Sequence, residues 1–342
     1  MRRNKWVILL SLLLGVLVSA FHSKNGAVLD YPDSWPRPVY DFRNNPISED
    51  GIALGRSLFY DPILSADSSI SCASCHLSYT AFTHVDHALS HGIHDSIGDR
   101  NSLALMNLAW SNNFMWDGAV NHLDMQALAP ITHAAEMGGD IKAVVEKLNA
   151  SEVYSDRFKA IYGMDEIDGA IVLKSLAQFQ VTLISADSKY DKVMAREEGV
   201  HFTAQEERGL ALFNSSCNSC HQAPLFTTGD FANNGLPVDM YLNDTGRMRV
   251  TRESADSLKF KIPTLRNIEF SKPYMHDGRF KTLSQVLDHY RSGILDSPTL
   301  EAELAGGIAL SSDEKVDLIA FLLTLTDRAF LFNPNHAFPR NN

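Results

Sequence analysis

Cys72-Ala73-Ser74-Cys75-His76 and Cys217-Asn218-Ser219-Cys220-His221 are two copies of one pattern, Cys-x-x-Cys-His, and together they contain all four cysteines of the 342-residue chain. In this pattern two thiols can add across the two vinyl groups of one haem, and the adjacent imidazole then lies under the iron as its ligand. A thioredoxin-like redox pair or half of a zinc site would explain a single copy. Two copies that end in histidine, with no further cysteine to complete a zinc site, favour two covalent c-type haems.

A weaker repeat surrounds the two motifs. Leu54-Gly55-Arg56-Ser57-Leu58-Phe59 precedes the first motif and Arg208-Gly209-Leu210-Ala211-Leu212-Phe213 precedes the second, and each predicts a helix that leads into Cys-x-x-Cys-His. The motifs begin 145 residues apart, which indicates a duplicated unit and not a short-period array. We therefore expect a mainly α-helical protein of two cytochrome c-like domains, 21–195 and 196–342, with one haem in each and the haems near the domain interface.

Hydrophobic periodicity predicts two longer helices. Ala170 to Ser185 carries an apolar stripe at helical spacing, and so does Ser312 to Thr326, where Ser311 followed by Glu314 predicts a capping box. The polar stretch Asp187–Gly199 is interpreted as the linker between the domains. Strand signals are few, and loops rich in Gly, Asn and Asp suit a protein that wraps cofactors with irregular backbone.

The amino terminus has the layout of a secretory signal. Arg2, Arg3 and Lys5 precede an apolar or small run from Trp6 to Ala20, which is short for a membrane span. Residues 1–20 are therefore interpreted as a signal peptide, with an uncleaved anchor as the alternative. Either interpretation places the body of the protein in the periplasm, where c-type haem is attached. No disulfide is expected, because the haems use all four thiols.

Composition and charge limit the classes of partner. The chain is 45% hydrophobic and 21% charged, as expected for a globular protein, and its formal net charge is -11. The negative charge argues against nucleic acid as a partner. An acidic surface can steer a basic electron donor towards the protein, although a solvated acidic surface without a partner explains the charge equally well.

Further motifs carry a resemblance to a known family. They are Leu58-Phe59-Tyr60-Asp61-Pro62 with Leu64-Ser65, Gly98-Asp99-Arg100-Asn101, Trp116-Asp117-Gly118, Gln126, Pro130, Glu136-Met137, Pro263-Thr264-Leu265-Arg266-Asn267 and Pro273-Tyr274-Met275-His276-Asp277-Gly278. In this order they resemble the bacterial di-haem cytochrome c peroxidases and their relative MauG, the di-haem enzyme that matures the quinone cofactor of methylamine dehydrogenase. The resemblance extends from about Gly51 to Gly293.

The resemblance implies catalytic roles for three residues. Peroxide cleavage needs an open iron coordination site and a group that moves a proton between the two oxygens. In the family, a glutamate at the position of Glu136 stands over the peroxide-binding haem, here the one on His76, and a glutamine at the position of Gln126 helps to hold the bound oxygen species. Trp116 matches a tryptophan that conducts electrons or holes between the haems. By themselves, Glu136 would read as a carboxylate at a helix start and Trp116 as a core residue.

The sixth iron ligands decide the subtype. In the peroxidases a methionine fourteen residues after the histidine of Tyr-x-His-Asp-Gly ligates the second haem, whereas MauG has tyrosine there, and this chain has Tyr290. A phenolate stabilises oxidised iron and predicts a low potential for the haem on His221, while a surface tyrosine is the alternative interpretation. At the position of the distal histidine that closes the first haem in many peroxidases, this chain has Ile93, so we expect an open iron, with His91 or His94 as second-choice ligands.

The resemblance also implies a calcium ion between the haems. Its ligands would be Asn101 and the backbone carbonyls near Ser271 and Pro273, because oxygen ligands suit a hard cation. Asn101 alone would more often be a turn residue than a ligand.

Three functions remain in competition. The first is a peroxidase that reduces hydrogen peroxide to water with electrons from a small periplasmic cytochrome c or cupredoxin. The second is a MauG-like oxidase that modifies a partner protein through high-valent iron. The third is a non-catalytic di-haem electron carrier in which both irons are saturated. The sequence leaves open whether the molecule forms a homodimer.

Overall fold

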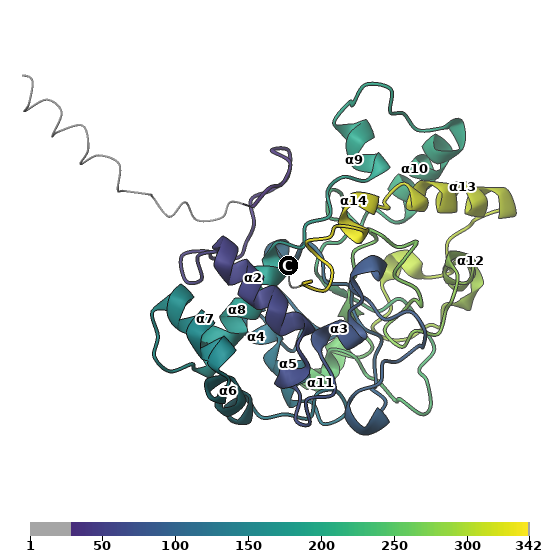
Figure 1. Cartoon of the computed structure of the whole chain (residues 1–342). Coiled ribbons are helices and arrows are strands. Elements are labelled where there is room, and N and C mark those ends of the chain that lie inside the picture. Colours follow the sequence, from purple (N-terminus) through teal and green to yellow (C-terminus); the bar gives the residue numbers. More distant parts are fainter. Residues whose placement is uncertain (1–28, 341–342) are drawn as a thin grey trace, which may run out of the picture.

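The computed structural model describes residues 29–340, and the predicted signal peptide lies outside them. The described part is mainly helical, as the sequence predicted (Figure 1). Its one regular sheet is an antiparallel pair of two-residue strands, β1 (Phe231–Ala232) and β2 (Phe260–Lys261), with Phe231 opposite Lys261. No helix in residues 29–340 is long and apolar enough to cross a membrane.

The α-helices are α2 (Glu49–Tyr60), α3 (Cys72–Cys75), α4 (Leu123–Gln126), α5 (Leu128–Thr132), α6 (Ile141–Ala150), α7 (Glu152–Tyr162), α8 (Gly169–Val181), α9 (Lys189–Met194), α10 (Ala204–Ser216), α11 (Met248–Thr251), α12 (Leu283–Asp288), α13 (Ser312–Leu323) and α14 (Arg328–Leu331). Short 3-10 turns are η1 (Pro62–Leu64), η2 (Ser78–Thr80), η3 (Ile93–Asp95), η4 (Leu108–Trp110), η5 (Ser254–Asp256) and η7 (Ala302–Leu304), while η6 (His289–Gly293) is a π-helix.

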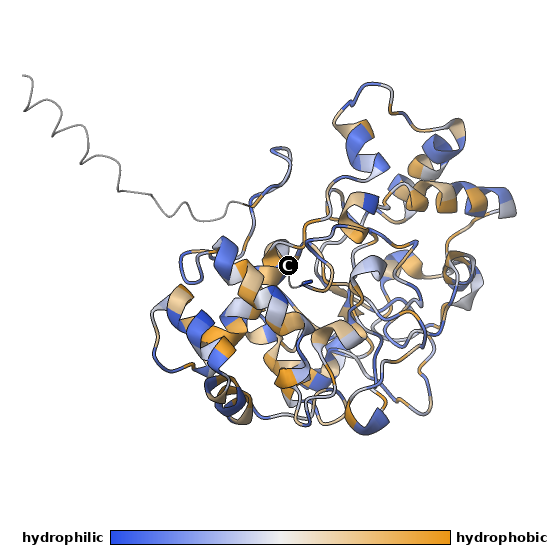
Figure 2. Ribbon diagram, in the orientation of Figure 1, coloured by the Kyte–Doolittle hydropathy of each residue, from blue (hydrophilic) through white to orange (hydrophobic). Residues whose placement is uncertain are grey.

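The first hydrophobic core is built around α2 and α8, which pack against each other (Figure 1). Gly55 permits the close approach, because a Cβ at this position would lie 2.0 Å from the carbonyl oxygen of Ser175 on α8. Phe59 of α2 and Phe179 of α8 meet edge to face with ring centroids 5.3 Å apart. Figure 2 shows hydrophobic residues among hydrophilic ones along these helices, as expected for helices at the edge of a core. Helix α2 therefore buries one side, including Leu54, Leu58 and Phe59, ahead of the first haem motif.

The second core repeats this arrangement with α10 and α13. A Cβ at Gly209 would lie 2.0 Å from the carbonyl oxygen of Asp317 on α13. Arg208 closes the same contact from the outside, with its Nε donating to Asp317 Oδ2 at 2.7 Å. The glycines of the two repeated segments thus occupy matching places, one in each helix pair. Close helix packing ahead of each haem motif is the physical reason for the sequence repeat.

The structure reveals a second pair of repeated segments that the sequence reasoning missed. Phe114-Met115-Trp116-Asp117-Gly118 and Tyr274-Met275-His276-Asp277-Gly278 form the same turn, each closed by an isolated antiparallel bridge, Phe114 with Val120 and Tyr274 with Phe280. Both turns place methionine at positive φ, 66° at Met115 and 75° at Met275. Trp116 and His276 therefore occupy equivalent positions in the two turns, and each directly precedes an Asp-Gly pair.

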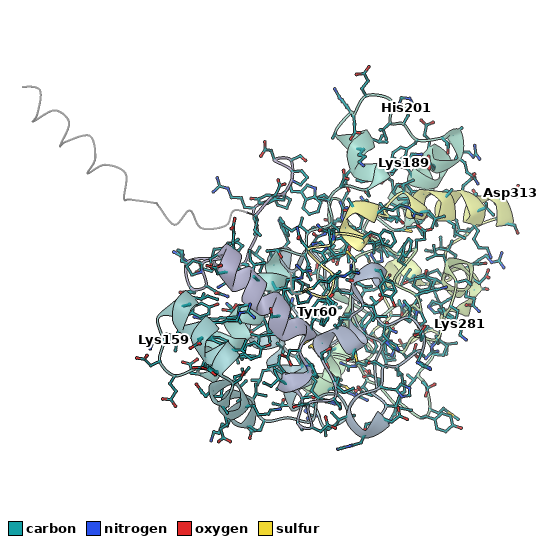
Figure 3. All side chains as sticks on the ribbon, viewed as in Figure 1. Tyr60, Lys159, Lys189, His201, Lys281 and Asp313 are labelled. Atoms are coloured by element: carbon teal, nitrogen blue, oxygen red, sulfur yellow. The ribbon has the colours of Figure 1, made fainter. Side chains whose placement is uncertain are left out.

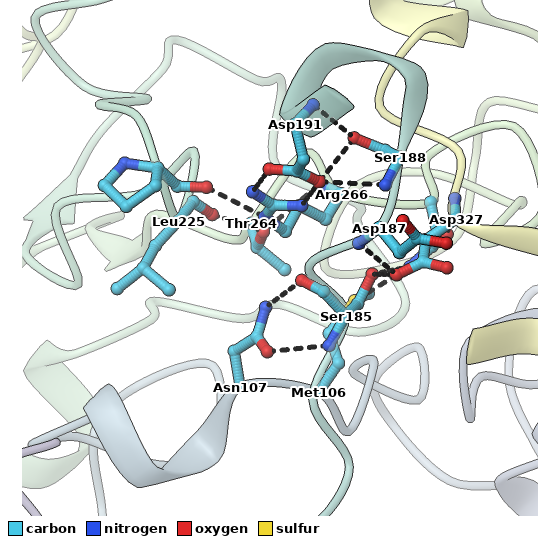
Figure 4. A network of polar contacts seen from close by, with 12 residues as sticks. Met106, Asn107, Ser185, Asp187, Ser188, Asp191, Leu225, Thr264, Arg266 and Asp327 are labelled. Carbon is cyan, nitrogen blue, oxygen red and sulfur yellow. Dashed lines mark hydrogen bonds and ion pairs between the residues drawn. The ribbon is translucent and has the colours of Figure 1, made fainter. Parts of the chain in front are cut away.

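Polar contacts join the two cores where α8 and α13 end. Ser185 Oγ donates to Asp327 Oδ2 at 3.1 Å. The side-chain amide of Asn107 donates through Nδ2 to the Ser185 carbonyl oxygen and accepts through Oδ1 from the Ser185 N–H. Asn267 Nδ2 donates to Ser185 Oγ at 2.9 Å. Figure 4 shows Ser185 between Asn107 and Asp327. These two asparagines lie nine residues before Trp116 and His276, respectively, so the same joint fixes both turns.

The predicted helices are present with shorter ends. The helix predicted from Ala170 to Ser185 ends at Val181, because the next residues bend to bind Asn107. The helix predicted up to Thr326 ends at Leu323, and its capping box between Ser311 and Glu314 is confirmed. The stretch interpreted as a linker contains the helix α9, which begins with a capping box of its own.

Candidate active site

Both motif histidines are arranged as iron ligands. His76 Nδ1 lies 2.6 Å from the carbonyl oxygen of Phe82, and His221 Nδ1 lies 3.3 Å from that of Phe226. A carbonyl can only accept, so these contacts assign the proton to Nδ1 and leave the Nε2 lone pair for a metal. Burial lowers the pKa of both imidazoles, that of His221 to about 4. Each ring is thus held in the neutral form that ligates iron.

The second motif opens into a cavity of about 370 Å³. Cys217, Cys220 and His221 line it together with Tyr290 and Met275. Its volume lies within the range of small-molecule and cofactor sites, and attachment thiols and a potential sixth ligand face the same space. These residues fit a covalently bound haem c.

Tyr290 reaches the cavity because the backbone departs from α-helical geometry at this place. It belongs to the π-helix η6, which directly continues α12, and such insertions are frequent at functional sites. Its hydroxyl accepts a hydrogen bond from Asn234 Nδ2 at 3.3 Å, and Asn234 Nδ2 also lies 3.6 Å from Met275 Sδ. Burial raises the pKa of Tyr290, so the free hydroxyl keeps its proton.

Trp116 lies at the wall of the same cavity, where the two halves of the chain meet. Its Nε1 donates to the carbonyl oxygen of Asn101 at 2.8 Å, and its ring meets His276 edge to face at 6.5 Å. The backbone N–H of Asn101 donates to the carbonyl oxygen of His276, and that of Lys261 donates to the carbonyl oxygen of Trp116, both at 2.7 Å. A hydrogen bond and a ring contact therefore orient the indole, and backbone bonds hold the segments around it. The neighbouring Trp110 is a core residue, which packs edge to face against Tyr31 and Trp35.

A buried ion-pair cluster supports the turn of Trp116. Arg100 donates to Asp117 Oδ2 at 2.5 Å and forms two bonds to Asp244, at 2.6 and 2.9 Å. Although burial opposes it, the hydrogen bonds and charge of Arg100 lower the pKa of Asp244. The cluster ties the segment after the first haem motif to the loop after the second.

Glu136 lies beside the first haem motif. Burial raises the pKa of the Cys75 thiol; a hydrogen bond with Ser90 opposes this shift, and the nearby Glu136 charge adds a smaller increase. Burial also raises the pKa of Glu136, opposed by His133, whose Nδ1 lies 3.6 Å from Glu136 Oε1. A carboxyl group with a raised pKa is suited to carry a proton near neutral pH.

Backbone contacts fix the loop of Glu136. The Ile93 N–H donates to the Glu136 carbonyl oxygen at 2.8 Å, and the Ala66 N–H donates to that of Met137 at 2.9 Å. A Cβ at Gly92 would lie 2.2 Å from the Ala135 carbonyl oxygen and 2.3 Å from that of Glu136. The absence of a side chain at Gly92 thus lets two loops approach each other at the carboxylate.

Gln126, at the end of α4, contacts Met115 and not Glu136 through its side-chain amide. Its Nε2 is 4.0 Å from Met115 Sδ, and no hydrogen bond joins it to Glu136 among residues 29–340. Met115 precedes Trp116, so Gln126 lies against the turn that carries the indole.

The two histidines beside Ile93 face carboxylates. His91 Nδ1 lies 2.5 Å from Asp95 Oδ1, and His94 Nδ1 lies 3.8 Å from Asp67 Oδ2. His94 adopts a positive φ of 54°.

Asn101, Ser271 and Pro273 also line the cavity of the second motif. Asn101 Nδ2 donates to the Ala88 carbonyl oxygen at 2.9 Å. Among the described residues, no group of three or more His, Cys, Asp and Glu side chains is arranged to hold a metal ion.

Comparison with known proteins places this geometry. Residues 49–199 match the family model of the di-haem cytochrome c peroxidases. The methylamine utilization protein MauG of Methylorubrum extorquens is 36% identical over 305 residues, which cover 86% of this chain and 82% of that protein. The chain belongs to the di-haem cytochrome c peroxidase family.

Other relatives agree with this assignment. The cytochrome c551 peroxidase of Nitrosomonas europaea is 33% identical over 334 residues, covering 95% of this chain and 92% of that protein. A solved structure described as a MauG-like protein associated with microbial copper homeostasis superposes with a TM-score of 0.82 at 31% identity, covering 92% of this chain and 99% of that one. The interpretation of the chain as a peroxidase-like haem oxidoreductase is confirmed.

The sequence reasoning missed two residues of the site. Asn234 lies in a polar loop and was not separated from its neighbours, and Lys261 is a lysine in a segment with no helical or strand periodicity. The only available signal for Lys261 was its position two residues before the Pro-Thr-Leu-Arg-Asn motif. Its place in the cavity wall depends on the tertiary contact with Trp116.

Proposed function

We propose that this chain is a periplasmic di-haem peroxidase that reduces hydrogen peroxide to water with electrons from a small cytochrome c or cupredoxin. Its two domains, 21–195 and 196–342, would each hold one haem c. One observation carries the proposal: the cysteines and histidine of the second motif share a single cavity with Tyr290 and Trp116. Such a cavity supports a ligated electron-transfer haem that is connected to the other half of the molecule.

Bound haem iron would supply the redox chemistry of peroxide cleavage. His76 would hold the peroxide-binding haem, with its imidazole oriented by the Phe82 carbonyl. Glu136, with its raised pKa, would take the proton from one peroxide oxygen and deliver it to the other, which leaves as water; two electrons from the donor protein and two further protons would convert the remaining oxygen to a second water. Gln126 helps to hold the substrate from the turn of Met115.

Trp116 and Tyr290 serve the second haem. Trp116 conducts electrons between the two haems, and its hydrogen bond to Asn101 keeps the indole in one orientation. Tyr290 and His221 line the same cavity, so Tyr290 could serve as a second protein ligand to the iron on His221, and that iron would then take up no peroxide. As an iron ligand, the Tyr290 phenol would have to lose its proton. Burial raises the pKa of Tyr290, and the positive charge of bound iron would lower it again.

A calcium ion is a further part of the proposal. Asn101 Nδ2 is engaged by Ala88, which leaves the amide oxygen to turn towards a cation, with backbone carbonyls at Ser271 and Pro273 at the same cavity.

The test is a spectrum of the purified holoprotein before and after stoichiometric hydrogen peroxide. We expect peroxide to change the spectrum, and we expect Tyr290→Phe to alter the spectrum of one haem only. A protein whose spectrum is untouched by peroxide, in the oxidised and the half-reduced states alike, would be an electron carrier and not an enzyme.

A MauG-like function, oxidation of a partner protein, is favoured by one observation, the tyrosine at the sixth-ligand position. Rapid steady-state turnover with a reduced cytochrome c or cupredoxin supports the peroxidase. Slow turnover with long-lived oxidised species would support protein oxidation.

A further inference from the structure

Lys261 is a half-buried, unpaired cation in the wall of the cavity. It lies on β2, and among the described residues that line the cavity of the second motif it is the only lysine or arginine. Its ammonium group has no hydrogen bond or ion pair with any residue in 29–340, and burial lowers its pKa to about 8. Two arginines that are shielded from solvent are paired, by contrast: Arg100 with Asp117 and Asp244, and Arg266 with Asp191.

An unpaired charge at such a place is costly. A haem that fills the cavity would cover this half-buried ammonium group, and covering a charge without a partner carries a desolvation penalty that proteins normally offset with a counter-ion. The cavity supplies no carboxylate within ion-pair distance of Lys261, although Asp230, Glu301 and Glu303 face it and act on Cys220. The missing anion is therefore expected to come with the molecule that fills the cavity.

The chemistry of that molecule indicates the anion. Haem c is attached through its vinyl groups, and its two propionate carboxylates project from the opposite side of the ring. The acidic residues act on Cys220, at the attachment edge. They repel a propionate there, whereas Lys261 attracts one beside Trp116, to whose carbonyl oxygen its own backbone is bonded at 2.7 Å.

We propose that Lys261 forms an ion pair with a propionate of the haem bound to His221 and thereby sets the potential of that haem and its orientation next to Trp116. Lys261 is a positioning residue, since it acts on the iron through the propionate. A positive charge near the iron favours its reduced state, so Lys261 opposes the lowering of potential that Tyr290 ligation causes. The inference rests on the proposed placement of a haem in this cavity.

The experiment uses the holoprotein with Lys261→Met, Lys261→Arg and a control, Lys281→Met. Lys281 is exposed at the surface, where solvent screens the charge (Figure 3). Haem content is measured first, and then a spectroelectrochemical titration gives the reduced fraction of each haem at fixed ambient potential.

In Lys261→Met we expect the reduced-to-oxidised ratio of the haem on His221 to fall roughly tenfold, which is about 59 mV for a one-electron couple. Lys261→Arg and Lys281→Met should keep the ratio within about twofold of the unchanged protein. An unchanged ratio in fully loaded Lys261→Met, or a shift confined to the haem on His76, overturns the proposal.

If Lys261→Met fails to incorporate the second haem, Lys261→Arg and Lys261→Gln are compared. Loading of the arginine variant but not the glutamine variant supports the ion pair, and equal loading with equal potentials overturns it. Tyr290→Phe provides the separate readout of the haem placement: if its one-haem spectral change is present while the Lys261 variants behave as unchanged protein, only the ion pair is wrong.

Discussion

Replacing Asp191 by asparagine is expected to destabilise the protein by about 3–5 kcal/mol at neutral pH. Arg266 is fully buried, and Asp191 accepts two of its bonds, at 2.8 Å from Nη1 and 2.7 Å from Nη2 (Figure 4). Asparagine keeps the shape of the carboxylate but not its charge, so the guanidinium would remain buried without a counter-ion. Its other contacts, the Pro224 carbonyl oxygen at 2.8 Å and the Trp35 ring at 4.7 Å, do not replace that charge.

Asp191 also takes part in the capping box of α9, which the control must separate. Ser188 Oγ donates to Asp191 Oδ2 at 2.6 Å, and Ser188→Ala removes the cap while the ion pair stays. Loss of an N-cap typically costs about 0.5–2 kcal/mol. Urea unfolding of the holoprotein, followed by far-ultraviolet circular dichroism and by the haem Soret band, gives the loss in free energy of unfolding for each of the two variants. A loss in Asp191→Asn no larger than that in Ser188→Ala would refute the reasoning.

The same pair predicts a pH dependence with a definite sign. Although burial opposes it, the hydrogen bonds and charge of Arg266 lower the pKa of Asp191 in the folded protein. Its stabilisation is therefore fully present above the unfolded pKa, about 3.9, and is lost as the pH falls through the lower folded value. The stability difference between the unchanged protein and Asp191→Asn should be constant from pH 7 to about pH 5 and should narrow below about pH 4.

Three further substitutions test the site. Glu136→Gln should lower peroxide turnover by about 10²–10⁴-fold with both haems attached, and a steady-state rate near that of the unchanged protein would remove Glu136 from proton transfer. Trp116→Phe loses one buried hydrogen bond and should cost only about 1 kcal/mol in urea unfolding. Turnover with a reduced donor should nevertheless fall far more than the small loss of stability explains; equal turnover would show that electrons take another route. Gly92→Ala forces a methyl group against the backbone of Ala135 and Glu136, so it should cost about 1–3 kcal/mol and reduce turnover at normal haem content. Unaltered kinetics in that variant would mean that the two loops separate without moving the carboxylate.

Local patterns in the sequence predicted several features well. The helices before the haem motifs, the capping box at Ser311 and the mainly helical fold depend on spacings of a few residues, which the chain encodes directly. Helix ends were predicted less well, because Asn107 is distant in sequence and yet captures the residues after Val181. The similar residues around Trp116 and His276 can be seen in the sequence, but only the backbone geometry shows that the two segments form the same turn.

The two Cys-x-x-Cys-His motifs by themselves predicted haem attachment, because the reach of two thiols and one imidazole around a haem is fixed by covalent geometry within five residues. Only the tertiary structure decided which side chains meet at the cavity of the second motif. Tyr290, Trp116 and Lys261 are far apart in the sequence and share one cavity because two helix pairs, each closed at a glycine, pack against a common polar joint. Such contacts depend on long-range packing and burial, which no local spacing specifies.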